Sequence, residues 1–348
     1  MLRTLIVGFG RSGHGLHWSV LRRLRRMERY AGLFSDEPPV VHDADPRTPQ
    51  LSDSDVIAVD DLAQARELLD PENTIVHLCT PPTHRLGPLT ELADLGFRKI
   101  LVEKPLVATV TELPDIDDLR RERKLELMVV AHWLQSALTL RLHDLVQGGE
   151  LGELETVFIA QRKPRIARTL ATEGHPTAFD VELPHSVGVV LSLAGEAKTV
   201  GAELRDMRVK NVVVPEMGAA RLFLDHTTGC QTEIFSDLAS PLRERVIRLG
   251  FSRGWAVGHY PISESDDHAH LTTSIEGLVP QPVFRDDSLS RFLVHAYEQF
   301  AYGADLEPDF QLNAGVTTLL AEAKEHARLS RLGAEVSTFQ PEVVRHAS

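Results

Sequence analysis

The sequence has little of several features that mark particular classes of protein. Two cysteines, Cys79 and Cys230, in 348 residues are too few for a disulfide framework. No apolar run reaches the roughly 20 residues that a membrane-spanning helix needs. Basic residues do not dominate either, because 37 Lys and Arg stand against 50 Asp and Glu and the net charge is −13. We therefore expect a cytoplasmic protein with reduced thiols and no signal peptide, which binds neither nucleic acid nor membranes.

The first third of the chain alternates short apolar runs with helical patterns. Such alternation predicts a parallel sheet with helices on both of its faces. Strands are expected at 3–8, 40–45, 55–59, 74–80, 99–103 and 126–131. Helices are expected near 12–30, 61–70, 85–95 and 111–123.

The pattern changes after a helix near 137–147, where Gly148, Gly149 and Gly152 interrupt the chain. Strand-like runs with few helices follow, which predicts an open, mostly antiparallel sheet. Its strands are expected at 155–160, 199–204, 211–214, 219–225, 229–235 and 244–250, with helices near 184–194, 288–303 and 311–331. The predicted fold is thus α/β, with a doubly wound parallel sheet in residues 1–131 and an α+β domain in residues 132–348. We expect the last helices to pack back on the first domain.

A glycine-rich segment joins the first expected strand to the first expected helix. The pattern G-x-G-x-x-G is matched by Gly8, Phe9, Gly10, Arg11, Ser12 and Gly13. Its first glycine permits a tight turn, its second lets the backbone approach a pyrophosphate, and its third lets the helix pack closely on the strand. This context favours a dinucleotide site of these six residues over a turn without a ligand.

An acidic residue after the second strand is expected to bind the ribose of the dinucleotide. Asp45 lies about 30 residues beyond Gly13, and a long arginine-rich helix with its following loop accounts for the spacing. A carboxylate accepts hydrogen bonds from the ribose hydroxyls and repels a 2′-phosphate, so we expect NAD to be preferred over NADP. Arg47 would soften this preference, and Asp43 is a rival to Asp45.

Two further motifs stand at the ends of expected strands, HLCTPPTHR at 77–85 and KILVEKPLVAT at 99–109. With the glycine motif, they give the chain a pattern that resembles the Gfo/Idh/MocA family of oxidoreductases. The resemblance includes the E-K-P signature at Glu103, Lys104 and Pro105. It implies a Rossmann domain, a second domain with an open sheet, and hydride transfer between NAD(P) and an alcohol. The same resemblance implies homo-oligomers formed through the C-terminal sheet.

The two motifs supply candidate residues beside the expected nicotinamide. The carboxyl ends of parallel strands line the ligand crevice of an open sheet. Lys104 is expected to stabilise the developing alkoxide and to contact both cofactor and substrate. The further cofactor candidates are Thr80, Pro81, Pro82, His84 and Glu103.

The second domain is expected to supply the proton-transfer group. By resemblance to the family, His185 at the start of a helix is the general acid/base, since a pKa near 6.5 suits reversible proton transfer. The family places an acid four residues before this histidine, but Val181 stands there in this chain. Glu182 is the first candidate for the displaced carboxylate, and Asp180 is the second.

Other candidates for substrate binding are Trp133, Gln135 and Arg162. The histidines and aspartates within 258–270 fit no defined metal spacing, so no metal site is expected. The predicted activity is that of an NAD(P)-dependent dehydrogenase acting on the CH–OH group of a sugar, cyclitol or related polyol. One alternative is a reductase of another acceptor, such as an imine or a keto-sugar in a biosynthetic pathway. Another is a non-catalytic protein that senses the dinucleotide and regulates a partner.

Overall fold

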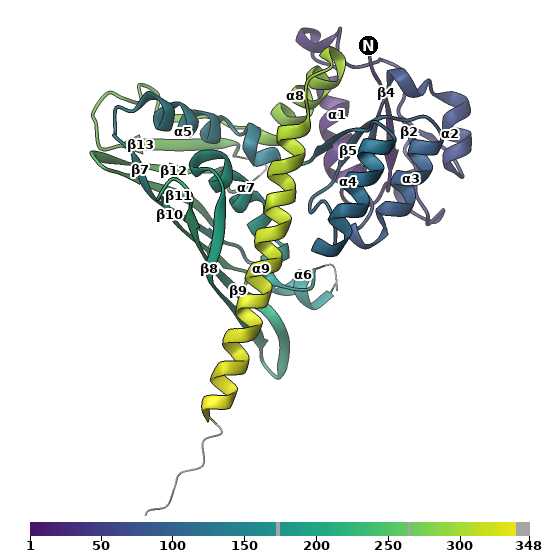
Figure 1. The fold of residues 1–348 in the computed structure, drawn as a ribbon. Coiled ribbons are helices and arrows are strands. Elements are labelled where there is room, and N and C mark those ends of the chain that lie inside the picture. Colours follow the sequence, from purple (N-terminus) through teal and green to yellow (C-terminus); the bar gives the residue numbers. More distant parts are fainter. Residues whose placement is uncertain (172–174, 264–265, 339–348) are drawn as a thin grey trace, which may run out of the picture.

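A computed structural model describes residues 1–171, 175–263 and 266–338 of the chain. Two sheets lie side by side, each with its own helices, and the long helix α9 (Glu307–Thr338) runs between them (Figure 1). The doubly wound parallel sheet and the mostly antiparallel sheet predicted from the sequence are confirmed.

The N-terminal sheet has six parallel strands in the order β3-β2-β1-β4-β5-β6. The strands are β1 (Arg3–Val7), β2 (Val40–His42), β3 (Ile57–Ala58), β4 (Thr74–Leu78), β5 (Lys99–Val102) and β6 (Glu126–Val129). The strand order reverses between β1 and β4, where open α/β sheets hold their ligands beyond the strands' carboxyl ends. Every predicted site residue of the first 110 positions follows one of these strand ends.

Four short α-helices flank this sheet. They are α1 (Ser19–Leu24), α2 (Leu62–Leu68), α3 (Leu86–Asp94) and α4 (Leu113–Glu122). The helix predicted over 12–30 is interrupted, because Gly13–Trp18 forms a π-helical turn before α1 and Glu28–Tyr30 a separate 3₁₀ turn. In the π turn, the N–H of His17 donates to the carbonyl of Ser12, 3.0 Å away. Such turns recur at functional sites.

The second sheet has eight strands in the order β14-β13-β12-β11-β7-β10-β9-β8. Its strands are β7 (Leu154–Arg162), β8 (Ala197–Val209), β9 (Val212–His226), β10 (Gln231–Asp237), β11 (Glu244–Phe251), β12 (Gly254–His259), β13 (His268–Thr273) and β14 (Val283–Arg285). β7 and β10 run parallel, and the other neighbours in the described chain are antiparallel. The strands predicted at 211–214 and 219–225 are one strand, β9, and β12 to β14 lie where no strand was predicted.

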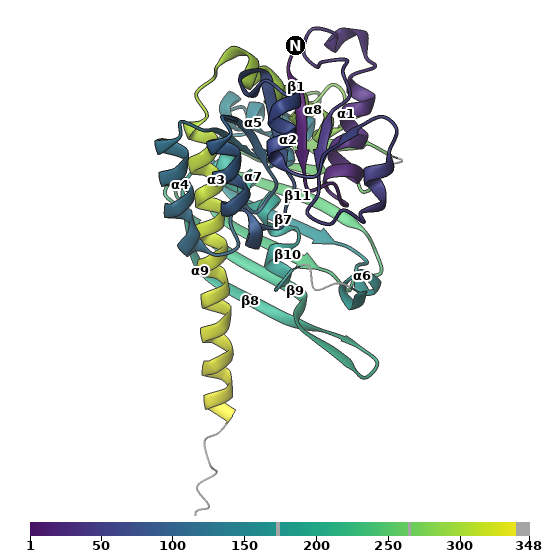
Figure 2. The same cartoon turned by 90° about the vertical axis from the view of Figure 1, so that its right-hand side faces the viewer.

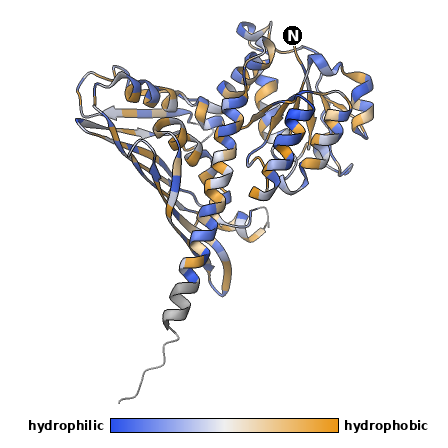
Figure 3. Ribbon diagram, in the orientation of Figure 1, coloured by the Kyte–Doolittle hydropathy of each residue, from blue (hydrophilic) through white to orange (hydrophobic). Residues whose placement is uncertain are grey.

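Helices cover one face of this sheet and leave the other open. α5 (Ala137–Gly148), α7 (Leu183–Ala194) and α9 share a hydrophobic core with the strands. Buried and partly exposed residues alternate along β9 and β10, as do hydrophobic and hydrophilic colours (Figure 3). A short helix, α6 (Ile166–Ala171), follows β7 on the side of the first sheet (Figure 2).

The C-terminal helices connect the two sheets. α8 (Ser288–Tyr302) packs on the parallel sheet, where the hydroxyl of Tyr297 lies 2.6 Å from Oγ1 of Thr4 and 3.0 Å from Nε2 of His77. At the start of α9, Asp309 accepts a hydrogen bond from the backbone N–H of Val129, 3.2 Å away. The last strand of the first sheet and the helix that covers the second sheet are thereby held together.

Candidate active site

The glycine loop leaves room for a ligand at one position only. Gly8 has a φ of +88°, and a Cβ there would lie 3.0 Å from the carbonyl carbon of Cys79. A Cβ on Gly13 would lie 2.1 Å from the carbonyl oxygen of Gly8, so close packing requires this glycine. A Cβ on Gly10 would meet nothing within 4 Å. The loop therefore fits a dinucleotide, because the open space at Gly10 is where the backbone approaches the pyrophosphate.

Of the two aspartates considered for the ribose, Asp43 and not Asp45 contacts the glycine loop. β2 ends at His42 instead of extending to residue 45, so Asp43 comes directly after the strand. Its Oδ2 accepts a hydrogen bond from the N–H of Phe9, 2.7 Å away. Asp45 is exposed and accepts from the backbone and side chain of Arg47, at 3.0 and 2.9 Å. Asp43 is thus the acid that the structure places beside the glycine loop.

Glu103 locks the glycine loop to the E-K-P loop. Its carboxylate accepts hydrogen bonds from the hydroxyl of Ser12, from the backbone N–H of Lys104 at 3.1 Å, and from Nε2 of His17 at 3.0 Å. Burial disfavours both charges of the His17–Glu103 pair, but Cys79 and Glu103 together favour the charged form of His17, and His17 with Ser12 favours the charged form of Glu103. As a result, the pKa of His17 is raised and that of Glu103 is lowered. The hydrogen bond from the Ser12 hydroxyl to the Glu103 carboxylate therefore connects the glycine loop to the E-K-P loop.

The loop after β4 is fixed by a buried arginine. Arg85 donates to the carbonyls of Thr80 at 2.9 Å and Leu106 at 3.0 Å, and also to that of Pro105. The hydroxyl of Thr80 is buried without a hydrogen-bond partner, which suits a polar group of a ligand. Exposed Pro81, partly exposed Pro82 and exposed His84 follow, and His84 contacts only the neighbouring Thr83 hydroxyl, at 2.9 Å.

Lys104 and His185 line the same narrow cavity, and they come from the two different domains. Lys104 follows β5, whereas His185 lies in the first turn of α7. The Nζ of Lys104 donates to the carbonyl oxygen of Val181, 3.1 Å away. The structure therefore brings together the two residues predicted to carry the chemistry, and it does so at the carboxyl edge of the parallel sheet.

His185 is kept uncharged by its surroundings. Burial lowers its pKa well below the ordinary value, and the positive charges of Lys104, Arg245 and Lys163 act in the same direction. Its Nδ1 is buried and has no hydrogen-bond partner. The imidazole is therefore a neutral ring with an unused nitrogen beside the cavity.

Neither predicted carboxylate contacts the His185 ring among the described residues, which corrects the expected acid–histidine pair. Glu182, at the start of α7, pairs with Lys163 and lies 3.8 Å from Arg245. Asp180 caps a 3₁₀ turn and accepts from Lys324 of α9 at 2.6 Å. Burial would raise the pKa of Glu182, but Lys163 and Arg245 lower it below the ordinary range. Both acids therefore serve as ion-pair partners around the site.

Aromatic rings orient His185 instead. The ring of Trp133 stacks on His185 with 5.7 Å between centroids and on Tyr260 with 4.2 Å. Trp133 is buried, so its faces are covered by protein and are not free to stack on a sugar. The ring of His132 lies edge-on to that of His185, with 4.6 Å between the centroids. The sequence analysis did not name His132, although it follows shortly after the end of β6.

The other two substrate candidates lie apart from the cavity lining. Arg162 pairs with Glu244 and stacks over Phe235, on the opposite face of β7 from Gln161, whose amide donates to Ser186 of α7. Gln135 uses its backbone carbonyl to accept from Arg291 of α8 at 2.9 Å. Arg162 therefore belongs to the open face of the second sheet.

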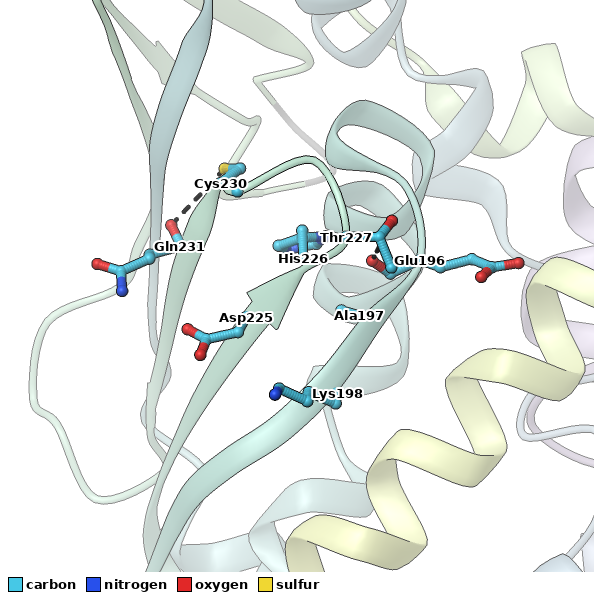
Figure 4. Close-up of a pocket in the computed structure, with 9 residues that line it drawn as sticks. Glu196, Ala197, Lys198, Asp225, His226, Thr227, Cys230 and Gln231 are labelled. Carbon is cyan, nitrogen blue, oxygen red and sulfur yellow. Dashed lines mark hydrogen bonds between the residues drawn. The ribbon is translucent and has the colours of Figure 1, made fainter.

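A wider hollow of about 480 Å³ lies at the edge of the second sheet (Figure 4). It is formed around the start of β8 and the turn between β9 and β10, and no predicted site residue lines it. Within the described ranges, no three His, Cys, Asp or Glu side chains gather as a metal site would require. The described helices include none with the length and apolarity to cross a membrane.

Residues 2–131 match the model of an oxidoreductase family with an NAD-binding Rossmann fold, Gfo/Idh/MocA. The match covers the N-terminal domain and leaves residues 132–348 outside it. The resemblance stated from the sequence motifs is thereby confirmed, and the cofactor class of the domain is NAD(P).

One curated relative is dTDP-3,4-didehydro-2,6-dideoxy-alpha-D-glucose 3-reductase of Streptomyces antibioticus, 34% identical over 131 residues. The match covers 36% of this chain and 40% of the relative, less than half of each. Among solved structures, GenD2 from gentamicin A biosynthesis, in complex with NAD, has a TM-score of 0.72 at 19% identity over 95% of both chains. KijD10, a 3-ketoreductase from Actinomadura kijaniata with NADP and TDP-benzene, has a TM-score of 0.72 at 14% identity, over 93% of this chain and 97% of its own. These likenesses show that the chain, with both of its sheets, shares the fold of these two proteins.

Proposed function

We propose that the protein is an NAD(P)-dependent oxidoreductase that transfers a hydride between the nicotinamide and a secondary alcohol or ketone of a sugar, cyclitol or related polyol. One observation carries the proposal: Lys104, from the loop after β5, and His185, from helix α7, line one cavity. An ammonium group and a neutral imidazole are the donor and acceptor that interconversion of an alcohol and a ketone needs. The glycine loop with open space at Gly10 supports a dinucleotide beside them.

Each site residue has one task in this reaction. A bound nicotinamide supplies or accepts the hydride. Lys104 donates a hydrogen bond to the reacting oxygen and stabilises the negative charge that develops there. In the direction of oxidation, Nδ1 of His185 takes the hydroxyl proton, since the ring is neutral and this nitrogen is unused. Lys163 and Arg245 keep Glu182 ionised beside the cavity.

The relatives favour a keto-sugar as the acceptor. The curated relative is named as a 3-reductase of a dTDP-linked didehydro-dideoxy-glucose, and KijD10 as a 3-ketoreductase, in a complex with TDP-benzene. We therefore propose reduction of a keto-sugar as the first reaction to test, with oxidation of free polyols as the second. For the cofactor, Asp43 and Asp45 after β2 place negative charge near the loop, which disfavours a 2′-phosphate and supports NAD.

We also propose that the protein is a cytoplasmic homo-oligomer that associates through the open face of the second sheet. That face carries aromatic rings with arginines stacked on them, including Phe235 with Arg162 and Arg221, and Phe158 with Arg248. Aromatic and arginine side chains are enriched in interfaces. The free thiols Cys79 and Cys230 suit a reducing compartment.

A substrate screen tests the activity. Purified protein is mixed with NADH or NADPH and a panel of keto-sugars, including dTDP-linked ones, and with NAD or NADP and a panel of polyols. Turnover of one panel member that is lost in Lys104→Ala and in His185→Ala, but kept in Lys99→Ala, supports the proposal. Lys99 is the first residue of β5, at the end of the strand away from Lys104, and its side chain donates to the Glu72 carbonyl. Lys99→Ala therefore shows the effect of removing a lysine away from the cavity. Full turnover by Lys104→Ala would overturn it.

A further inference from the structure

Arg165 is a buried arginine that forms no ion pair with any residue of the described ranges. The residue is 4% exposed and stands just before α6, where its backbone N–H donates to the carbonyl of Leu238 at 3.0 Å. Its Nε is buried without a hydrogen-bond partner. No Asp or Glu of the described ranges lies within ion-pair distance of its guanidinium. Because a buried, unpaired charge is costly, such a side chain points to an anion that binds from outside the chain.

The arrangement of Arg165 differs from that of Arg85, which is equally buried. Arg85 donates to three backbone carbonyls and thereby holds two loops together. The acids near Arg165 are also already occupied, since Glu182 pairs with Lys163 and Asp180 with Lys324. Among the described residues, the Arg165 guanidinium therefore neither holds loops together, as Arg85 does, nor forms an ion pair with a carboxylate.

More positive charge surrounds Arg165 on both sides of the site. Burial and the neighbouring charges of Arg168 and Arg11 together lower its pKa to about 10, although the charge of Glu182 acts in the opposite direction. Burial lowers the pKa of His175 to about 4, together with the positive charges of Lys104 and Arg165. The positive region thus extends from the glycine loop, at Arg11, to the cavity at Lys104.

A neutral donor accompanies the charges. Thr169 lies one turn beyond Arg165, and its N–H donates to the Arg165 carbonyl at 2.9 Å. The Thr169 hydroxyl is buried and has no hydrogen-bond partner. Guanidinium groups and hydroxyls together are the donors that bind phosphate oxygens.

We propose that Arg165, with Thr169 and the charge of Arg168, binds a phosphate or diphosphate group of the substrate. This inference rests on the proposed function and narrows its substrate class to phosphorylated sugars such as nucleotide-linked ones. The dinucleotide's own diphosphate is a second source of the same chemistry. The substrate is favoured because the cluster belongs to the segment after β7, whereas the glycine loop offers its own backbone N–H groups to the cofactor.

Calorimetric titration of the NADH-saturated protein with dTDP, and with thymidine as the ligand without phosphate, tests the site. We expect dTDP to bind at least tenfold more tightly than thymidine, and Arg165→Gln to abolish this difference while leaving the affinity for NADH within twofold. Arg26→Gln is the matched control, because Arg26 is exposed in the turn after α1 and the substitution removes the same charge. Arg165→Lys keeps the positive charge but not the planar guanidinium that binds phosphate through two N–H groups, so an intermediate loss of dTDP affinity is expected.

Three results would overturn the inference. Equal binding of thymidine and dTDP would show that no phosphate is recognised, and an unchanged dTDP affinity in Arg165→Gln would place the phosphate elsewhere. An equal loss of NADH affinity would assign Arg165 to the cofactor's diphosphate. If Arg165→Gln does not fold, the Arg165→Lys variant decides between the same outcomes. A wild-type protein that binds no NADH would instead contradict the proposed function itself.

Discussion

The side chain of Lys104 reaches across the site to the backbone of Val181. Its Nζ donates to the Val181 carbonyl oxygen at 3.1 Å, so the loop after β5 contacts the segment that leads into α7. This single bond positions the ammonium group beside His185 before any substrate enters. A substrate oxygen between the two side chains would find a donor already directed across the cavity.

Replacing Lys104 by alanine should therefore reduce kcat without removing the cofactor site. We expect a loss of about 10²-fold to 10⁴-fold in kcat, the usual contribution of a positioned acid–base or oxyanion group. The dissociation constant for NADH should change by less than threefold, because the glycine loop does not depend on Nζ. Steady-state kinetics and a fluorescence titration measure the two quantities. A loss confined to KM would assign Lys104 to substrate binding alone.

The pH dependence of alcohol oxidation should show no protonation step near pH 6.5. Burial, followed by the charges of His132, Lys104 and Arg245, lowers the pKa of His185 well below that value. The proton-accepting ring is then neutral throughout pH 6 to 8, and kcat/KM should fall only at clearly lower pH. A profile of kcat/KM between pH 5 and 9 measures this. An ascending limb centred near pH 6.5 would show that His185 is solvated or is not the base.

The buried pair of His17 and Glu103 should make the fold sensitive to alkaline pH. His17 has a raised pKa of about 10, so its charge stabilises the fold fully below about pH 6.5 and this contribution is lost as the pH rises through 10. We expect His17→Gln to lower the free energy of unfolding by about 3 to 5 kcal/mol at pH 6, because Glu103 is left buried without its partner. Urea denaturation at pH 6 and pH 9 measures the change.

A matched control for that prediction is His84→Gln, since His84 is exposed. The difference in stability between wild type and His17→Gln should shrink from pH 6 to pH 9, whereas that between wild type and His84→Gln should stay near zero. A difference independent of pH would mean that His17 packs as a neutral ring.

Two glycines of the loop should respond differently to an added methyl group. Gly10→Ala should keep the stability of the wild type, because its Cβ meets no protein atom within 4 Å, but it should weaken NADH binding at least tenfold. Gly13→Ala should lower the melting temperature, because its Cβ would lie 2.1 Å from the Gly8 carbonyl oxygen. Thermal unfolding and NADH titration of both variants separate the effects. Unchanged NADH affinity in Gly10→Ala would place the diphosphate away from this loop.

The parallel sheet was predictable because its strands are continuous apolar runs that end in recognisable motifs. β1, β4 and β5 are almost wholly buried, and their motifs carry the glycine loop and Lys104. The strands β12 to β14 lie at one side of the second sheet, and in β13 the exposed residues His268 and His270 alternate with the buried residues Ala269 and Leu271. Residues 258–270 therefore had the composition of a loop although His268–Thr273 pairs on both sides.

The site was predictable to the extent that single residues follow strand ends, and not where contacts come from distant segments. Lys104 and His185 line one cavity, as their positions suggested. No pattern in the sequence, however, indicates that Lys324 of α9 forms an ion pair with Asp180, or that the ring of Trp133 stacks on that of His185. Of the two aspartates considered for the ribose, Asp43 rather than Asp45 contacts the glycine loop, because β2 ends at His42. These outcomes depend on tertiary packing and on strand boundaries, which residue spacing does not fix.

Titration of the purified protein with NADH and NADPH, followed by its fluorescence, is the most direct test of whether this fold works as a dinucleotide-dependent enzyme. We expect saturable binding with NADH preferred, weakened at least tenfold by Gly10→Ala, and a larger loss of NADH affinity in Asp43→Ala than in Asp45→Ala. Asp43 accepts from the Phe9 N–H within the loop, whereas Asp45 is exposed beside Arg47. Absence of binding by either dinucleotide would contradict the assignment of the glycine loop and, with it, the proposed hydride transfer.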